Sequence, residues 1–197
     1  MQREVELKSV VDDVDSRRRR IEAAGGTLVF EGRLDDRRYD TGDRRLSSTG
    51  ELLRLRVAED AAGARVSLEW KGPTRHEDGY KVRDELAATV TNAAPLRAIL
   101  EKLGFSVTGE IDRHVAQYTL GDAVVRFERY PQMDALVEVE GAPDAIERAI
   151  SALGMDRAGF TADRLPTFMA RFERRTGTAA AVNRRQLGGA AREAADG

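Results

Sequence analysis

Hydrophobic and charged residues alternate along many stretches of this chain, a pattern typical of β-strands with one buried face. Near the amino terminus, Val5 and Leu7 alternate with Glu4, Glu6 and Lys8. Successive side chains of a strand point to opposite faces, so the three charged groups share one face and the two apolar groups share the other. The same alternation predicts further strands at residues 27–34, 37–41, 52–57, 64–71, 80–90, 110–120, 123–130 and 136–141.

Four other stretches place apolar residues three or four positions apart, which is the spacing of amphipathic helices. They are residues 12–24, 92–103, 143–153 and 163–175. Gly25 and Gly104 directly follow the first two, as glycine commonly does at the carboxyl end of a helix. From Thr176 onward the chain is rich in Ala, Gly and Arg and has no apolar periodicity. We therefore predict one domain over residues 1–175 and a mostly disordered tail over residues 176–197.

The polar faces of the predicted strands are ionic in one strand after another. Acidic residues dominate the first and last strands, where Glu138 and Glu140 repeat the spacing of Glu4 and Glu6, and basic residues dominate the middle strands. If the apolar face packs on helices and the ionic face curls inward, the sheet closes into an α+β barrel around a charged tunnel. Its first and last strands are then neighbours. Uncompensated buried charges are costly, so such a tunnel needs a metal ion and a polyanion.

Composition narrows the ligands that such a tunnel could take. The 197 residues include 32 Lys and Arg against 34 Asp and Glu, so the chain lacks the bulk positive charge typical of nucleic-acid-binding proteins. It has no cysteine, and its two histidines, His76 and His114, are expected at the surface. A metal would therefore need oxygen ligands, which suit Mg²⁺, Mn²⁺ or Ca²⁺ rather than zinc. No stretch is apolar enough to span a bilayer or to act as a leader, so we expect a cytoplasmic location.

The basic strands also have interpretations that need no ligand. Arg54 and Arg56 could be edge-strand charges that prevent aggregation. Lys71 precedes a Gly-Pro pair and could be a simple strand-end cation, while Arg83 and Glu85 could form a cross-strand ion pair.

Six short motifs follow one another along the chain. They are Glu4-x-Glu6-x-Lys8, Tyr39-Asp40-Thr41, Leu53-Arg54-Leu55-Arg56, Trp70-Lys71-Gly72-Pro73, Arg83-x-Glu85 and Glu138-x-Glu140. In this order they resemble the CYTH superfamily of triphosphate tunnel metalloenzymes, which includes inorganic triphosphatases, thiamine triphosphatases and class IV adenylyl cyclases. The resemblance covers residues 1–175. It implies a closed tunnel of eight antiparallel strands with helices on the outside, which binds a small-molecule triphosphate together with Mg²⁺ or Mn²⁺.

Carried over by position, the resemblance also assigns roles to individual residues. The implied metal ligands are Glu4, Glu6, Glu128, Glu138 and Glu140. The implied phosphate contacts are Lys8, Arg54, Arg56, Lys71, Lys81, Arg83, Arg113 and Arg126. The implied catalytic residues are Lys8, Lys71 and Glu85. Tyr39 serves only as a marker of its motif, because a tyrosine there is more typical of a core or rim position.

Three positions depart from the family pattern and leave the substrate open. Glu128 stands where an Asp is common, and Val115 stands where a second basic residue often follows Arg113. The segment Asp134-Ala135-Leu136 replaces a Gly-x-Phe sequence.

The function implied by the resemblance is metal-dependent hydrolysis of inorganic, nucleoside or thiamine triphosphate. Class IV adenylyl cyclases, which convert ATP to cyclic AMP and pyrophosphate, often have a His-Phe pair before the first acidic strand. This chain has Met1-Gln2-Arg3 there, which favours hydrolysis over cyclisation. A third alternative is a non-catalytic binder of polyphosphate or nucleotide. We expect no nucleic-acid or membrane partner, and pairing of two copies into a homodimer stays open.

Overall fold

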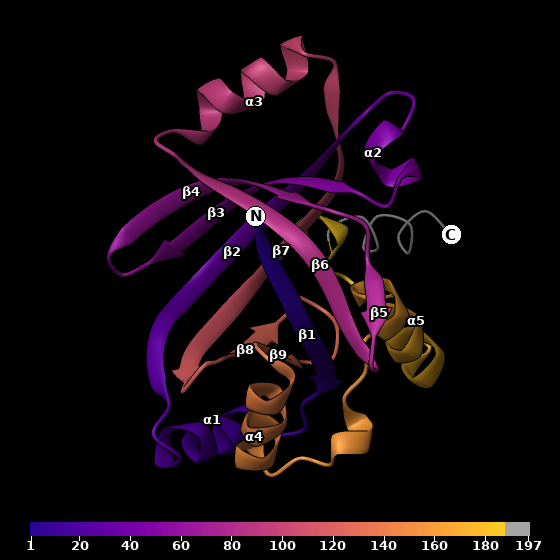
Figure 1. Cartoon of the computed structure of the whole chain (residues 1–197). Helices are drawn as coiled ribbons and strands as arrows, with labels where there is room; N and C mark the ends of the chain where they lie inside the picture. Colours follow the sequence, from indigo (N-terminus) through magenta and orange to yellow (C-terminus); the bar gives the residue numbers. More distant parts are fainter. Residues whose placement is uncertain (188–197) are drawn as a thin grey trace.

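Eight antiparallel strands close into a barrel in the computed structural model, which describes residues 1–187 (Figure 1). They are β1 (Gln2–Val10), β2 (Thr27–Thr41), β3 (Leu52–Asp60), β4 (Gly63–Lys71), β6 (Tyr80–Val90), β7 (Phe105–Leu120), β8 (Ala123–Arg129) and β9 (Leu136–Glu140). Their order around the wall is β1-β9-β8-β7-β2-β3-β4-β6, and β6 pairs back with β1. The short β5 (Arg75–Glu77) adds to β6 outside this ring. The predicted closed α+β barrel is confirmed.

The closure brings the first and last strands together, as the charge pattern predicted. Lys8 of β1 is the register partner of Glu138 of β9, and Glu6 is the partner of Glu140. On its other edge, β1 places Glu6 opposite Lys81 of β6. The two acidic strands are therefore neighbours, with a basic strand beside them.

The helices lie outside the barrel (Figure 1). They are α1 (Val14–Ala23), α2 (Arg45–Ser48), α3 (Ala93–Lys102), α4 (Pro143–Leu153), the short 3₁₀ helix η1 (Arg157–Gly159) and α5 (Leu165–Thr176). Local signals set their ends: Asp13 accepts a hydrogen bond from the Ser16 amide at the start of α1, and Gly154 ends α4 with a left-handed φ of 63°. None of the described helices is both long and apolar enough to cross a bilayer.

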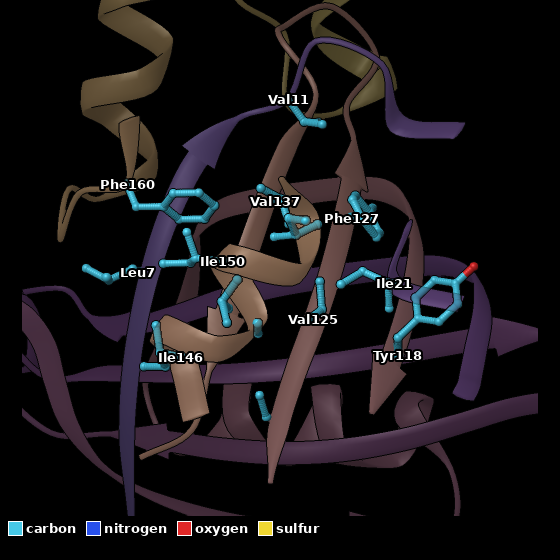
Figure 2. Close-up of a cluster of buried hydrophobic side chains, with 14 of the residues drawn as sticks. Leu7, Val11, Ile21, Tyr118, Val125, Phe127, Val137, Ile146, Ile150 and Phe160 are labelled. Atoms are coloured by element: carbon cyan, nitrogen blue, oxygen red, sulfur yellow. The ribbon is translucent and has the colours of Figure 1, made fainter. Parts of the chain in front are cut away.

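The main core fills the space between one side of the barrel and helices α1 and α4 (Figure 2). Val125, Phe127 and Val137 from the outer face of the wall are fully buried there, together with Ile21 of α1 and Ile146 of α4. A smaller core lies under α3 and contains Tyr39, Leu55 and Leu100, so Tyr39 is a core residue. Because the apolar face of the sheet packs outward on helices, its ionic face must turn inward.

Several details differ from the sequence-based prediction. The predicted strands at residues 27–34 and 37–41 form one continuous β2, and β7 begins at Phe105 rather than at Glu110. The short elements α2, β5 and η1 were not predicted, because they span only three or four residues and show no periodicity.

Part of the predicted disordered tail packs on the domain. Ala180, Ala181 and Val182 are buried, and Ala181 exchanges two backbone hydrogen bonds with Gln132, at 2.8 and 3.0 Å. The Val182 carbonyl accepts from the Asp112 amide at 2.9 Å. Residues 180–182 of the predicted tail therefore pack on the domain, while residues 188–197 lie outside the described part of the chain.

Candidate functional site

The barrel encloses a cavity of about 410 Å³ whose wall is mostly ionic. This volume falls in the range of roughly 300–1,000 Å³ that small-molecule sites occupy. Ten cationic side chains line it: Lys8, Arg38, Arg54, Arg56, Lys71, Lys81, Arg83, Arg113, Arg126 and Arg164. Seven anionic side chains line it too: Glu4, Glu6, Asp36, Asp40, Glu51, Glu128 and Glu138. The excess of positive charge suits an anion.

Most of the predicted site residues meet in this cavity. All eight predicted phosphate contacts line it, as do four of the five predicted metal ligands. Glu140 and Glu85 do not line it. Glu85 of β6 is the register partner of Gln2 on β1 and of Lys71 on β4. It forms an ion pair with Lys71.

The acidic strands form a buried cluster with lysines. Glu6 Oε1 accepts from Lys8 Nζ at 2.8 Å and also pairs with Lys81, while Lys8 pairs further with Glu138. Burial alone would lower the pKa of Lys8, but Glu138 and Glu6 outweigh it and hold that pKa well above its ordinary value. Lys71 Nζ donates to Glu4 Oε1 at 2.9 Å. Glu4, Glu6 and Glu138 therefore each already have a lysine partner.

On the opposite wall, one carboxylate joins three of the predicted phosphate contacts. Asp36 is 1% exposed and accepts from Arg54 Nη1 at 3.2 Å, from Arg56 Nε at 2.7 Å and from Arg113 Nη1 at 2.9 Å. Burial works to raise the pKa of Asp36, but the three guanidinium groups outweigh it and hold that pKa well below its ordinary value. Glu69 binds Arg54 in addition. Asp36 thus binds and orients three of the predicted phosphate contacts.

A second hydrogen-bonded network joins Arg113 and Tyr130 through Glu128. Glu128 accepts from Arg113 Nε at 2.7 Å through Oε1 and from the Tyr130 hydroxyl at 2.6 Å through Oε2. Burial and the Glu128 charge together raise the pKa of Tyr130 well above its ordinary value, so the phenol stays protonated. Both oxygens of Glu128 are therefore bound within the protein.

The remaining predicted contacts use other partners. Arg83 donates to backbone carbonyls, to Gly72 O at 2.6 Å and to Gly50 O at 3.1 Å, and its burial lowers its pKa. It therefore also holds the loop at Gly50 to the end of β4. Arg126 pairs with Glu138 and donates to Gln117 Oε1 at 3.0 Å.

Glu140 is the exception among the acidic residues. Its nearest cation is Arg126, with a distance of 3.9 Å between Nη2 and Oε2. Burial raises its pKa to about 7, helped by the charges of Glu138, Glu4 and Glu6 and opposed by Arg126. Glu140 is therefore the carboxylate that gains most from a nearby cation.

The Tyr39-Asp40-Thr41 motif builds the rim of the cavity. Asp40 is buried and accepts from the backbone amides of Leu46 at 3.0 Å and Ser47 at 2.9 Å, which fixes the loop that contains α2. Ser47 and Gly50 of this loop line the cavity. The motif is thus structural, and it positions one edge of the site.

Asp36, Arg38, Tyr130 and Arg164 are among the lining residues that were not predicted as site residues. Asp36 falls between the two predicted strands at residues 27–34 and 37–41, and Arg38 belongs to a run of four charged residues, 35–38, in which apolar and charged residues do not alternate. Tyr130 continues the two-residue spacing of Arg126 and Glu128. Arg164, just before α5, has no sequence signal.

The chemistry of the carboxylates fits a divalent cation. Glu4 Oε2 is buried and has no hydrogen-bond partner within residues 1–187, and both ion pairs of Glu6 involve Oε1 alone. Carboxylate oxygens of this kind are ligands for Mg²⁺ or Mn²⁺. Within the described residues, however, no three Asp, Glu, His or Cys side chains are grouped as a ready metal site. A metal would have to replace lysine and arginine as partner of these carboxylates.

Comparison with known proteins places this geometry in a family. The sequence profile of the CYTH domain matches residues 2–150. No curated protein sequence matches the chain significantly.

Solved structures share the fold. A candidate adenylate cyclase from Vibrio parahaemolyticus is 21% identical, with a TM-score of 0.72 over 86% of this chain and 98% of that one. The PH1819 protein from Pyrococcus horikoshii is 20% identical, with a TM-score of 0.71 over 85% and 98%. The HpAC1 protein from Hippeastrum, a candidate adenylyl cyclase with a dominant triphosphatase activity, is 14% identical, with a TM-score of 0.59 over 87% and 96%.

Proposed function

Because the chain belongs to the CYTH domain family, we propose that it is a divalent-metal-dependent hydrolase of triphosphate compounds bound in the tunnel. The observation that carries this proposal is the closed cavity with ten cationic side chains against seven anionic ones. The excess charge suits a triphosphate, and the depth of the barrel keeps its phosphates out of bulk water.

The arginines of the Asp36 wall are proposed to bind the phosphates. A guanidinium group offers parallel N–H donors that match two oxygens of one phosphate. Arg54, Arg56 and Arg113 are already held by carboxylates, so little conformational freedom is lost when a phosphate arrives. On the opposite wall, Lys8, Lys71 and Lys81 are proposed to neutralise the remaining phosphate charge.

The acidic cluster is proposed to hold Mg²⁺ or Mn²⁺. CYTH proteins are generally metal-dependent. Glu4 and Glu6, whose Oε2 atoms have no ion pair among residues 1–187, are the first candidate ligands, with Glu138, Glu140 and Glu128 beside them. Such a metal supplies charge neutralisation and an activated water. The lysines released from the carboxylates would then be available to the phosphates.

A class IV adenylyl cyclase is the second candidate, favoured by the fold shared with the candidate cyclase from Vibrio parahaemolyticus. A third is a non-catalytic binder, favoured by the existing lysine partners of Glu4, Glu6 and Glu138. The same tunnel could serve all three.

One experiment separates these candidates. The purified protein is incubated with tripolyphosphate, ATP or thiamine triphosphate, each with Mg²⁺ or Mn²⁺, and the products are identified by mass spectrometry. Release of phosphate is expected. Cyclic AMP with pyrophosphate would support the cyclase instead, and tight binding without any product would support the binder.

A further inference from the structure

A second cavity, between β7 and α5, adjoins the tunnel cavity. This β7–α5 groove has a volume of about 720 Å³. It shares six lining residues with the tunnel: Arg38, Thr108, Gly109, Ile111, Leu165 and Pro166. A ligand could therefore extend from one into the other without leaving the protein surface.

The wall of the groove differs in chemistry from that of the tunnel. Its apolar part comes from Val107, Ile111, Leu165, Pro166, Met169 and Val182. The charges of two of its arginines are balanced by Glu110. Arg185 Nη1 lies 2.8 Å from Glu110 Oε2, and Arg37 Nε lies 3.6 Å from Glu110 Oε1. An inorganic phosphate chain has no apolar surface to bury here. An organic group with flat apolar faces gains from burial in such a groove.

The groove also offers a polar edge. The Gln186 side chain accepts from the Val182 and Asn183 amides through Oε1, at 2.8 and 3.2 Å. Within the described residues, its Nε2 has no hydrogen-bond partner. A donor beside an apolar wall is suited to the hydrogen-bonding edge of a nucleobase.

Arg38 lies at the junction of the two cavities. Its side chain forms no hydrogen bond or ion pair with any residue from 1 to 187, unlike Arg54 and Arg113 nearby. Burial and these two like charges lower the pKa of Arg38. Its register partner is Gly109, which carries no side chain to fill the junction. Arg38 is thus a cation that can bind an anion without giving up a carboxylate.

We propose that the β7–α5 groove holds the nucleoside of a nucleoside triphosphate whose phosphates lie in the tunnel, with Arg38 contacting the phosphate nearest the junction. This proposal rests on the triphosphate-binding function above. Much of the groove's apolar wall, from Leu165, Pro166, Met169 and Val182, follows residue 150, where the match to the CYTH profile ends. The preference for a nucleoside would therefore be set by a part of the chain outside that match.

Two matched valines allow a direct test. Val107 of β7 lines the groove and is 43% exposed, whereas Val29 of β2 lines neither cavity and is 49% exposed. Val107→Trp and, on α5, Met169→Trp would fill the groove, and Val29→Trp is the control. Binding of ATP and of tripolyphosphate to the full chain is measured by isothermal titration calorimetry without divalent metal, so that no metal-dependent turnover interferes.

Both groove variants are expected to weaken ATP binding by about tenfold, equivalent to ~1.4 kcal/mol, while tripolyphosphate binding changes little. Arg38→Gln should weaken both ligands, and Val29→Trp neither. An unchanged ratio of the two affinities in both groove variants would overturn the groove proposal while leaving the triphosphate function intact. If the wild-type protein binds neither ligand in this buffer nor after Mg²⁺ is added, the proposed function itself fails.

Discussion

Glu6 of β1 lies directly opposite Glu140 of β9 in the barrel wall, and only Glu6 of the two is bound to lysines. Two like charges at such a position repel each other. The pKa of about 7 at Glu140 reflects its burial and this acidic neighbourhood. Repulsion between the two carboxylates therefore destabilises the fold, and a bound cation would reduce this repulsion.

Two glutamates on β9 should respond in opposite ways to loss of charge. In metal-free buffer at mildly alkaline pH, Glu140→Gln should raise the free energy of unfolding, because an ionised, poorly paired carboxylate is removed. Glu138→Gln should lower it by about 3 kcal/mol, because it breaks buried ion pairs with Lys8 and Arg126. Urea unfolding of both variants measures this. Equal destabilisation would contradict the different roles given to the two residues.

Asp36 is expected to stabilise the fold and to weaken anion binding in the cavity. Asp36→Asn should lower the free energy of unfolding by about 3 kcal/mol, because Arg54, Arg56 and Arg113 lose their common partner. The same change makes the cavity more positive, so tripolyphosphate should bind more tightly in calorimetry. The control is Asp35→Asn, since Asp35 is the adjacent strand residue and does not line the cavity.

The stability that Asp36 contributes is expected to fall as the pH is lowered. A carboxylate whose pKa is lowered by folding contributes stability above its unfolded pKa of about 3.9, and the contribution is lost as pH falls through the folded pKa. The wild-type protein should therefore lose more stability on acidification than Asp36→Asn does. If the free energy of unfolding depends on pH in the same way in both proteins, Asp36 is not held ionised by the arginines.

The main core predicts a contrast between two isoleucines. Ile146 of α4 is fully buried against the barrel, whereas Ile99 of α3 is 53% exposed. Ile146→Ala should cost about 2–5 kcal/mol of unfolding free energy, as for other large-to-small core changes. Ile99→Ala should cost much less. Similar losses in thermal or urea unfolding would mean that α4 does not pack as Figure 2 shows.

The barrel was predictable because charge and apolar residues alternate with a period of two in nearly every strand. Its closure was expected from an ionic face that turns inward and was implied by the family resemblance, and it places Glu6 and Glu138 on neighbouring strands. Asp36 was missed because it lies between two predicted strands, in a run of four charged residues, 35–38, without apolar alternation.

Other parts of the site could not be read from local pattern. Glu128 was predicted as a metal ligand, but its two oxygens bind Arg113 and Tyr130, a partnership that depends on strand register rather than on spacing along the chain. Val182 lies in a segment without periodicity, and it is buried only because β7 offers a backbone partner, the amide of Asp112. Tertiary contacts of this kind leave no periodic signal.

The most direct measurement is phosphate release from tripolyphosphate, ATP and thiamine triphosphate, with and without Mg²⁺ or Mn²⁺, by the wild-type protein and Glu6→Ala. Circular dichroism confirms that the variant remains folded, and Val29→Trp serves as a surface control. We predict metal-dependent release by the wild-type protein that falls about 100-fold or more in folded Glu6→Ala, a loss of ~2.7 kcal/mol in transition-state stabilisation. Absence of release from all three compounds, or full activity of Glu6→Ala, would contradict a metal-dependent triphosphatase in this tunnel.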